Sequence, residues 1–459
     1  MAPPLEITMT SRSFHRLAVA SASLPLVLAA LSGCQAGAGK PGSVSGRYIV
    51  SLGDADMAAA ALTSRELGPR EPGSRDTLTV VSLPIQEPQT PHAQINVGNS
   101  ALCPPTCLAV SKDGRYAFVV DYRGEAPEGA ATIDDLPKGK HLVAVDLDVP
   151  LNPRICATAE VSEEPIAVSV NQAGTLVAVA TQTPRQQIVI VPFTRGEFTG
   201  EPSAWPLLGL DDDEAKPTSI AWHPGGAALA VTLQNRGEVM FYRFRVGDDG
   251  SMELAPWGTP VKVGKAPGSG AFSPDGRYFI VNDLQWGSDV EGYNVGVPQG
   301  QLVVIMVGDM PAGPDSSLGG PAGHIVIGSA PVGVSPIGMA ISSDGSLVAT
   351  ANLQRSHLPD SDPRVDPNQR GGSLSLLQLR SDGSLTPLAE YPINSMPAGL
   401  SFDARDQFLC VTQFRSFDPN AVDGELAFWK VKRTTPRSLE QADFYVGVGK
   451  GPHGVLIVR

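Results

Sequence analysis

The sequence has few cysteines, and it lacks the short motifs of several large enzyme classes. Its 459 residues include five cysteines and no Cys-x-x-Cys-His, so a c-type haem has no attachment motif. It also has no His-Glu-x-x-His, no Gly-x-Ser-x-Gly and no phosphate-binding loop. Standard zinc proteases, elbow-type serine hydrolases and nucleotide enzymes are therefore unsupported.

Positive charge is also in short supply. The 34 lysines and arginines stand against 47 aspartates and glutamates, which gives a net charge of -13 at pH 7. Such a surface repels nucleic acid and anionic lipid headgroups, so we expect no nucleic-acid partner. Glycine (49) and proline (41) are abundant and charged residues make up 18%, which is typical of a turn-rich globular protein.

A long apolar run is found at the N-terminus. Arg12 and Arg16 precede it, and it extends from Leu17 to Leu31, which is too short for a membrane-spanning helix. It ends in Leu31-Ser-Gly-Cys34, which resembles the bacterial lipobox, in which the cysteine is lipidated and becomes the new N-terminus. We therefore predict a signal peptide over residues 1–33, a lipid on Cys34 and a flexible tether over residues 34–46.

The lipobox resemblance implies a place in the cell envelope, outside the cytoplasm. Gln35 follows the cysteine and no aspartate comes next, which in a cell with two membranes indicates the outer membrane. We expect the lipid to be the only attachment to the membrane, because no later segment could span a bilayer.

A repeated unit fills the rest of the chain. Each copy has a proline followed six residues later by a polar turn, best seen in Ser111-Lys-Asp-Gly114, Ser273-Pro-Asp-Gly276 and Ser342-Ser-Asp-Gly345. Asp and Gly favour tight hairpins, so each copy predicts two short strands joined by this turn. The repeated prolines are Pro105, Pro165, Pro217, Pro267, Pro336 and Pro397. Their spacing of 50 to 69 residues leaves room for four strands per unit, as in a propeller blade.

A seventh proline, Pro452, begins a final β-rich run that ends at Arg459 before a partner strand can form. Three β-rich runs near residues 47–52, 78–83 and 94–97 lack an inner strand. We therefore predict an all-β fold: a seven-bladed β-propeller of four-stranded antiparallel blades over residues 47–459. Its last blade is shared by both ends of the chain, which removes free sheet edges.

The Ser-x-Asp-Gly turns, and a small residue two positions after each proline such as Cys107 or Gly338, resemble the YVTN and lactonase-like seven-bladed propellers. The resemblance covers nearly all of residues 44–459 and implies the architecture. That superfamily contains hydrolases, binding proteins and surface proteins, so the resemblance transfers no catalytic residue.

Cys103 and Cys107 are the one close cysteine pair. In an extended strand their Cα atoms would lie about 13 Å apart, which is too far for a disulfide. The two prolines between them would have to bend the chain to allow a bridge. The alternative is that Cys107 fills a small-residue position that faces the channel.

Four long loops are predicted on one face, after the second strands, at 121–140, 283–300, 352–372 and 412–424. Long loops on a rigid frame often carry binding sites. The candidate ligand or partner residues are Asp121, Asp283, Gln285, Asn352, Gln354, Arg355, Gln413, Arg415 and His453. Such side chains also serve to satisfy backbone groups where strands end, and the sequence leaves both roles open.

These features favour a binding or scaffold module of the cell envelope over an enzyme, with an envelope protein or a small ligand as the partner. The alternative is a lactonase-like or metal-assisted hydrolase with its site at the channel mouth. His357, Asp360, Asp362 and Asp366 could then supply ligands to a divalent cation, although their spacing is irregular. A redox propeller is disfavoured because the chain has only five tryptophans and no haem motif.

The lipid anchor gives the first testable prediction. Replacing Cys34 by Ala should release the protein from membranes, because stable anchoring needs the acyl chains that this cysteine carries. Fractionation of cells labelled with a fatty acid measures the change. A variant that still partitions with membranes and still incorporates the label would contradict the lipoprotein assignment.

Overall fold

The computed structural model describes residues 43–56, 61–68, 74–86, 89–99, 105–286, 299–309, 323–359, 361–362, 365–366, 368, 370–416 and 424–459. The signal peptide, the lipidation site at Cys34 and the cysteine at Cys103 lie outside the described residues, so these predictions stay untested. No described helix is long and apolar enough to cross a membrane.

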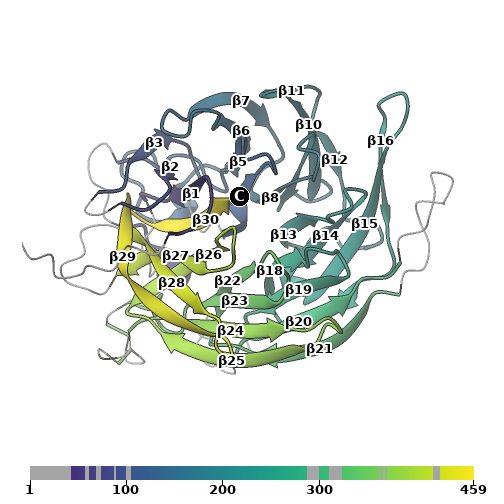
Figure 1. The fold of residues 1–459 in the computed structure, drawn as a ribbon. Coiled ribbons are helices and arrows are strands. Elements are labelled where there is room, and N and C mark those ends of the chain that lie inside the picture. Colours follow the sequence, from purple (N-terminus) through teal and green to yellow (C-terminus); the bar gives the residue numbers. More distant parts are fainter. Residues whose placement is uncertain are drawn as a thin grey trace, which may run out of the picture. The chain divides into compact units, whose positions relative to one another are not determined.

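Seven antiparallel sheets form a ring, each with its first strand beside the central channel (Figure 1). Blade 1 contains β4 (Leu108–Val110), β5 (Tyr116–Val120), β6 (His141–Asp146) and β7 (Arg154–Glu160). Blade 2 contains β8 (Pro165–Val170), β9 (Leu176–Thr181), β10 (Ile188–Thr194) and two short outer strands, β11 (Glu197–Phe198) and β12 (Ser203–Trp205). Blade 3 contains β13 (Pro217–Trp222), β14 (Ala228–Leu233), β15 (Glu238–Val246), and the outer β16 (Met252–Pro256) and β17 (Val261–Lys262).

The remaining blades follow the same order from the channel outward. Blade 4 contains β18 (Pro267–Phe272), β19 (Tyr278–Asp283), β20 (Gln301–Met306) and β21 (Ile325–Pro331). Blade 5 contains β22 (Pro336–Ile341), β23 (Leu347–Asn352), β24 (Ser373–Leu379) and β25 (Leu385–Pro392). Blade 6 contains β26 (Ser395–Phe402), β27 (Phe408–Ser416), β28 (Gly424–Lys432) and β29 (Ser438–Gly449). Blade 7 contains β30 (Pro452–Val458), β1 (Tyr48–Gly53), β2 (Thr77–Ser82) and β3 (His92–Asn96).

Helical structure is confined to short segments in the part of the chain described here. They are α1 (Ala61–Ser64) and the 3-10 turns η1 (Pro105–Cys107), η2 (Ile133–Asp135) and η3 (Gln234–Arg236). The predicted seven-bladed propeller is confirmed.

The polar turns of the repeat are hairpin turns, as predicted. In blade 1 the Ser111 hydroxyl donates to Asp113 Oδ1 at 2.6 Å, and Gly114 takes a φ of 71°. The corresponding turn of blade 6, Asp403–Asp406, has no glycine, and Asp406 takes the left-handed conformation with a φ of 52°. Local chemistry therefore fixes the connection between the first two strands of blades 1 to 6.

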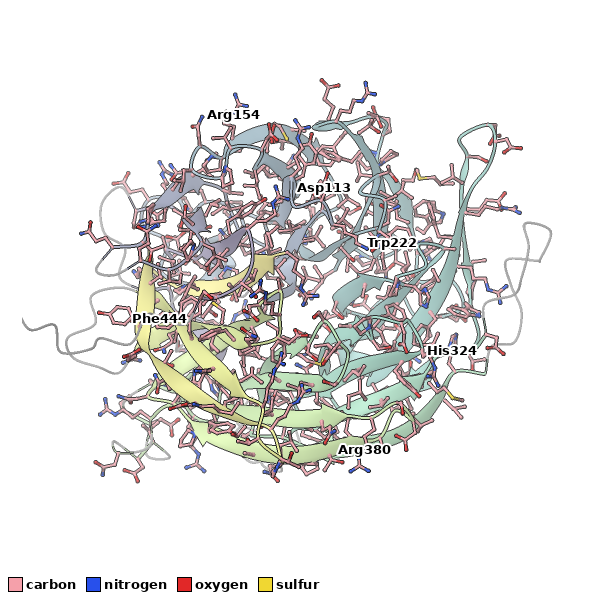
Figure 2. The ribbon with its side chains drawn as sticks, in the orientation of Figure 1. Asp113, Arg154, Trp222, His324, Arg380 and Phe444 are labelled. Atoms are coloured by element: carbon pink, nitrogen blue, oxygen red, sulfur yellow. The ribbon has the colours of Figure 1, made fainter. Side chains whose placement is uncertain are left out.

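The core lies between neighbouring blades, whose sheets pack face to face. Trp222 of blade 3 and Phe244 of the same blade meet edge to face at 5.3 Å, within an apolar cluster that also contains Ile188 and Ile190 of blade 2. Trp222 lies inside the ring, whereas Arg154 and Arg380 project from its periphery (Figure 2). Each sheet is thus buried on both faces and exposed at its outer strand.

The first strands of adjacent blades approach closely at the channel. A Cβ atom on Gly338 would lie 1.9 Å from the Ala398 carbonyl oxygen, and one on Gly399 would lie 2.6 Å from the His453 carbonyl oxygen. A side chain at either position would collide with backbone. The small residue after each proline is therefore a packing requirement of a narrow ring.

Blade 7 is built from both ends of the chain, as predicted. β30 pairs antiparallel with β1, which places Tyr48 opposite Val458 and Leu52 opposite Gly454. Figure 1 shows β30 beside β1, with the C-terminus near the channel. β30 supplies the channel strand that the N-terminal strands lack.

Contacts with the ring begin before β1. Val44 is buried, and the backbone N–H of Ser45 donates to Asp403 Oδ2 at 2.9 Å. The Ser45 hydroxyl donates to the same carboxylate oxygen at 2.6 Å. Because these two residues contact blade 6, the predicted tether can apply only to the residues before them.

Ring closure yields the second prediction. Deleting residues 450–459 should lower the melting temperature by about 10 °C or more, because blade 7 loses the buried side chains of Val455, Ile457 and Val458. Thermal unfolding followed by circular dichroism measures this. Deleting only Arg459, which is exposed and lies outside β30, is the matched control. Equal melting temperatures for the truncated and intact chains would refute the role of β30.

Candidate functional site

The candidate residues lie on the face where the second strand of each blade ends and the first begins. Asp283, Asn352 and Gln413 are at or near the ends of β19, β23 and β27, and His453 is near the start of β30. Because every blade runs in the same sense, these strand ends share one face of the ring. The structure therefore places the predicted residues on one face, but their side chains differ in burial and in hydrogen-bond partners.

Asp283 ties a strand end to the connection between blades. Its carboxylate is fully buried and accepts the backbone N–H groups of Ala266 at 2.9 Å and Gln285 at 3.1 Å. It also accepts from the side chain of Gln301 at 3.2 Å and from that of Gln285. These donors occupy the oxygens of Asp283. Its carboxylate therefore stabilises the fold by connecting the end of β19 to the segment before β18, and the Gln285 side chain folds back onto it.

Asp121 holds a histidine that was not among the predicted residues. Asp121 Oδ2 lies 2.7 Å from His141 Nδ1, and Oδ1 accepts the His141 backbone N–H at 2.6 Å. Burial raises the pKa of Asp121, while His141 acts in the opposite direction. The His141 side chain is 43% exposed, so the pair is accessible from solvent. No motif in the sequence indicates this pairing, which spans 20 residues.

A polar network leads from the end of β23 to the surface of blade 5. The buried Asn352 amide donates to the hydroxyls of Ser373 and Ser375, both at 3.0 Å. Ser373 donates to Glu390 Oε1 at 2.6 Å, and the Gln354 amide donates to the same oxygen at 2.7 Å. The side chains at this strand end are therefore fixed relative to one another.

A pocket of about 1060 Å³ borders that network and is large enough for a small ligand. Arg355 and Arg370 line it with Asp366 and Glu390, so both signs of charge face one space. Gln354 also lines the pocket and has a φ of 52°. Two predicted residues, Gln354 and Arg355, are thus brought together here.

Gln413 and Arg415 lie on β27 of blade 6 and are not among the described residues that line this pocket. Gln413 is buried opposite Pro397 and Glu425, whereas Arg415 is half-buried opposite Met396. The structure places both on the predicted face but does not join them to the pocket.

His453 is buried beneath this face. Its Nε2 lies 2.8 Å from Asn99 Oδ1, and its Nδ1 lies 3.8 Å from the sulfur of Cys107. The Asn99 amide group donates to the Val97 carbonyl at 2.8 Å, so its oxygen is the atom that faces His453, which donates to it. Burial disfavours the charged ring, but Cys107, Asp54 and Asp76 raise the pKa of His453. Cys103 lies outside the described residues, so its bridge to Cys107 stays a prediction.

Two carboxylates near His453 were not predicted: the buried Asp54 and the half-buried Asp76. Asp76 accepts the backbone N–H groups of Ala55 at 3.0 Å and Asn99 at 3.1 Å. Burial and the neighbouring charge of Asp54 raise the pKa of Asp76 to about 7. Asp54 follows β1 as Asp121 follows β5, so the blade repeat itself was the signal that could have identified it.

Apolar side chains also connect loops and strand ends of different blades. Leu62 of α1 packs with Ile133 and Leu136 of the blade 1 loop, and also with Leu353 and Met396 of blades 5 and 6. The same segment pairs with the blade 1 loop, since Leu67 donates to the Ala131 carbonyl at 2.9 Å. These contacts join loops from separate parts of the ring. The 1060 Å³ pocket lies at blade 5.

In the described part of the chain, no three His, Cys, Asp or Glu side chains are grouped closely enough to hold a metal ion. Asp360, one of the predicted ligands, lies outside the described residues.

The fold defines a seven-bladed β-propeller, and comparisons with known proteins agree with it. No protein-family model and no curated protein matches the sequence. Among solved structures, a periplasmic gluconolactonase from Pseudomonas aeruginosa is 15% identical with a TM-score of 0.55, and the match covers 90% of this chain and 99% of that one. A functionally unknown protein from Desulfotomaculum acetoxidans is 12% identical with a TM-score of 0.56, over 90% and 99% of the two chains. A protein from Lactobacillus plantarum is 16% identical with a TM-score of 0.53, over 89% and 98%. The resemblance to lactonase-like propellers is thus confirmed at the level of the fold.

The pair of carboxylates Asp54 and Asp76 gives the third prediction. The pKa of Asp76 is about 7 in the folded state and roughly 4 in the unfolded state, so the folded protein keeps a proton that the unfolded chain releases. The stability that Asp76 contributes is full below about pH 4 and is lost as the pH rises to about 7. Replacing Asp54 by Asn removes a neighbouring negative charge and should lower the pKa of Asp76. The variant should therefore be more stable than the wild type by roughly 1–2 kcal/mol at about pH 8.

Urea unfolding at about pH 4 and about pH 8 measures the effect on both chains. Asp249→Asn, in an exposed turn of blade 3, is the control and should leave the pH dependence unchanged. If Asp54→Asn and Asp249→Asn behave alike, the two carboxylates do not repel each other as described.

Proposed function

We propose that this protein is a lipid-anchored β-propeller of the cell envelope that binds a partner protein or small ligand on its long-loop face, through the pocket at blade 5. The pocket is the observation that carries the proposal, because Arg355 and Glu390 face one space of about 1060 Å³. A ligand with an anionic group and a hydrogen-bond donor would match these charges.

Hydrogen bonds to residues of the sheet fix the side chains that line the pocket, and this strengthens the proposal. Glu390 accepts hydrogen bonds from Ser373 and Gln354, and Ser373 is in turn bonded to the buried Asn352. Side chains fixed in this way lose little conformational entropy when a ligand binds. The loop residues Asp366 and Asn368, which are exposed, provide the outer wall.

A lactonase-like hydrolase is the second candidate, and the Asp121–His141 pair favours it. A carboxylate that accepts from Nδ1 leaves Nε2 of a neutral imidazole free to take a proton from water, which is the first requirement of general-base hydrolysis. The Pseudomonas aeruginosa gluconolactonase shares the fold. Hydrolysis of gluconolactone that is abolished by His141→Gln would favour this candidate over the binding module.

Photocrosslinking tests the binding proposal. A photoreactive amino acid at Asn368, which is exposed at the pocket, should give a discrete crosslinked product in intact cell envelopes. The same residue at Lys112, in a hairpin turn of blade 1, should not. Adding Arg355→Ala should reduce the product at Asn368 about tenfold, since one charge-assisted bond contributes roughly 1.5 kcal/mol.

Arg380→Ala, an exposed arginine near the β24–β25 hairpin, is the matched control for Arg355→Ala and should leave the product unchanged. The melting temperature of Arg355→Ala should stay close to that of the wild type. A large loss of thermal stability would show instead that Arg355 holds the fold together. A product from Lys112 and none from Asn368 would place the binding surface on the other face and refute the proposal.

A further inference from the structure

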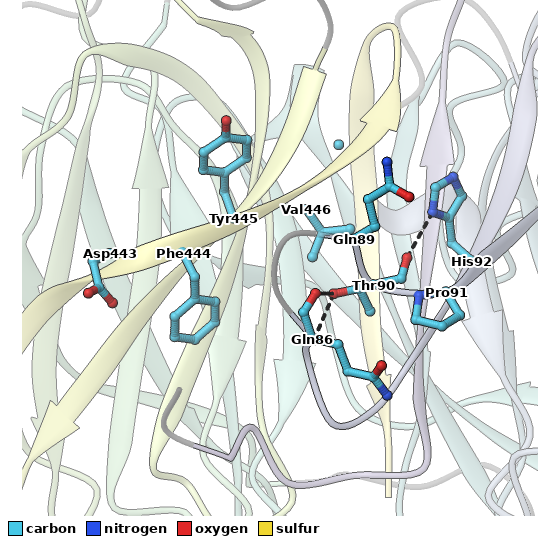
Figure 3. Close-up of a pocket in the computed structure, with 10 residues that line it drawn as sticks. Gln86, Gln89, Thr90, Pro91, His92, Asp443, Phe444, Tyr445 and Val446 are labelled. Atoms are coloured by element: carbon cyan, nitrogen blue, oxygen red, sulfur yellow. Dashed lines mark hydrogen bonds between the residues drawn. The ribbon is translucent and has the colours of Figure 1, made fainter. Parts of the chain in front are cut away.

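Another pocket lies on the outer rim, away from the long-loop face. It has a volume of about 810 Å³ and is bordered by the outer strand β29 of blade 6 and by the loop between β2 and β3 of blade 7 (Figure 3). We call this pocket the rim groove. Its two walls belong to blades 6 and 7. Its shape therefore depends on how these two neighbouring blades pack against each other.

Strand alternation sets one wall of the rim groove. Phe444 and Val446 are buried, and the Phe444 ring stacks on Phe428 at 5.1 Å. Successive side chains of a strand point to opposite faces, so Tyr445 between them points outward and is 66% exposed. Figure 3 shows Tyr445 and Phe444 on opposite sides of β29. An aromatic ring on a fixed strand can bind a flat apolar surface at small entropic cost.

Polar side chains form the opposite wall. Gln86, Gln89 and His92 are exposed there, and the Thr90 hydroxyl holds the loop by bonding the backbone N–H and carbonyl of Gln86, both at 3.0 Å. His92 Nδ1 lies 3.2 Å from the Thr90 carbonyl oxygen. A carbonyl can only accept, so Nδ1 carries the hydrogen and Nε2 of the neutral ring is an acceptor. The wall thus offers amide donors and acceptors and an imidazole acceptor.

The charges at the rim groove indicate which class of ligand it can bind. Among the described residues that line the rim groove there is no lysine or arginine, and Asp443 contributes a carboxylate. The whole chain carries a net charge of -13. An anionic ligand would therefore be repelled, whereas a neutral ligand rich in hydroxyl groups would find partners in the amides, the imidazole and the carboxylate.

We propose that the rim groove binds a neutral polysaccharide chain, with a sugar ring stacked on Tyr445 and its hydroxyls bonded to Gln86, Gln89, His92 and Asp443. A peptide added as a further strand to β29 is less suited, because the Val448 carbonyl on this strand already accepts from Gln94 and Thr79, at 3.1 and 3.3 Å. The site is separate from the blade 5 pocket and does not depend on the function proposed for it.

Titration calorimetry of the full-length protein with cellohexaose, maltohexaose and N-acetylchitohexaose tests the proposal. At least one of these neutral oligosaccharides should bind with a Kd below about 10 mM. Tyr445→Ala should weaken that binding about tenfold or more, because it removes the stacking surface. Tyr445→Phe, which keeps the ring, should retain most of the affinity.

A second variant fills the groove without disturbing the core. A Cβ atom on Gly447 would meet no other atom within 4 Å, and Gly447 lines the groove, so Gly447→Leu should block binding while the melting temperature is preserved. Ile155→Ala, an exposed apolar residue on the outer strand of blade 1, is the matched control and should bind like the wild type.

Three results would each overturn the proposal. The first is no binding of any of the three oligosaccharides at about 10 mM. The second is binding that Tyr445→Ala and Gly447→Leu leave unchanged. The third is a Tyr445-dependent interaction with extended peptides on an array, together with no binding of the sugars.

Discussion

The pairing of β30 with β1 is the interaction on which the rest of the structure depends. Six residues of β1, from Tyr48 to Gly53, meet the last strand of the chain in one antiparallel ladder. The same junction is held from both sides, because Ser45 bonds Asp403 of blade 6 and the Tyr48 hydroxyl donates to the Gly114 carbonyl of blade 1. A ring closed in this way has no free inner edge, so each blade is packed between two neighbours.

Polar residues at equivalent strand ends have different partners in different blades. At Asp283, at the end of β19, the carboxylate is occupied by backbone N–H groups and by the side chains of Gln285 and Gln301. At Asn352, at the end of β23, the hydrogen bonds continue through Ser373 to Glu390 and reach a pocket. The same residue types at equivalent positions therefore serve the frame in one blade and the surface in another.

The two candidate binding pockets lie at the side of the ring, one at blade 5 and one between blades 6 and 7. Leu62 packs against apolar residues of blades 5 and 6, and His453 is buried. A binding role at the blade 5 pocket and a sugar-binding role at the rim groove both use walls built on strands. Rigid walls of this kind are the contribution that the propeller makes to either role.

The sequence by itself determined the hairpins, the number of blades and the shared seventh blade. The turn at Ser111–Gly114 follows from local chemistry, and the repeated prolines mark strands such as β8 and β13 that begin at Pro165 and Pro217. It also identified the face that carries Gln354 and Arg355. Only the tertiary structure decided which side chains meet: His141 with Asp121, Glu390 with Gln354, and Asn99 with His453. The reason is that turns and strand alternation depend on neighbours along the chain, whereas these contacts depend on how loops and separate strands pack once the ring is closed.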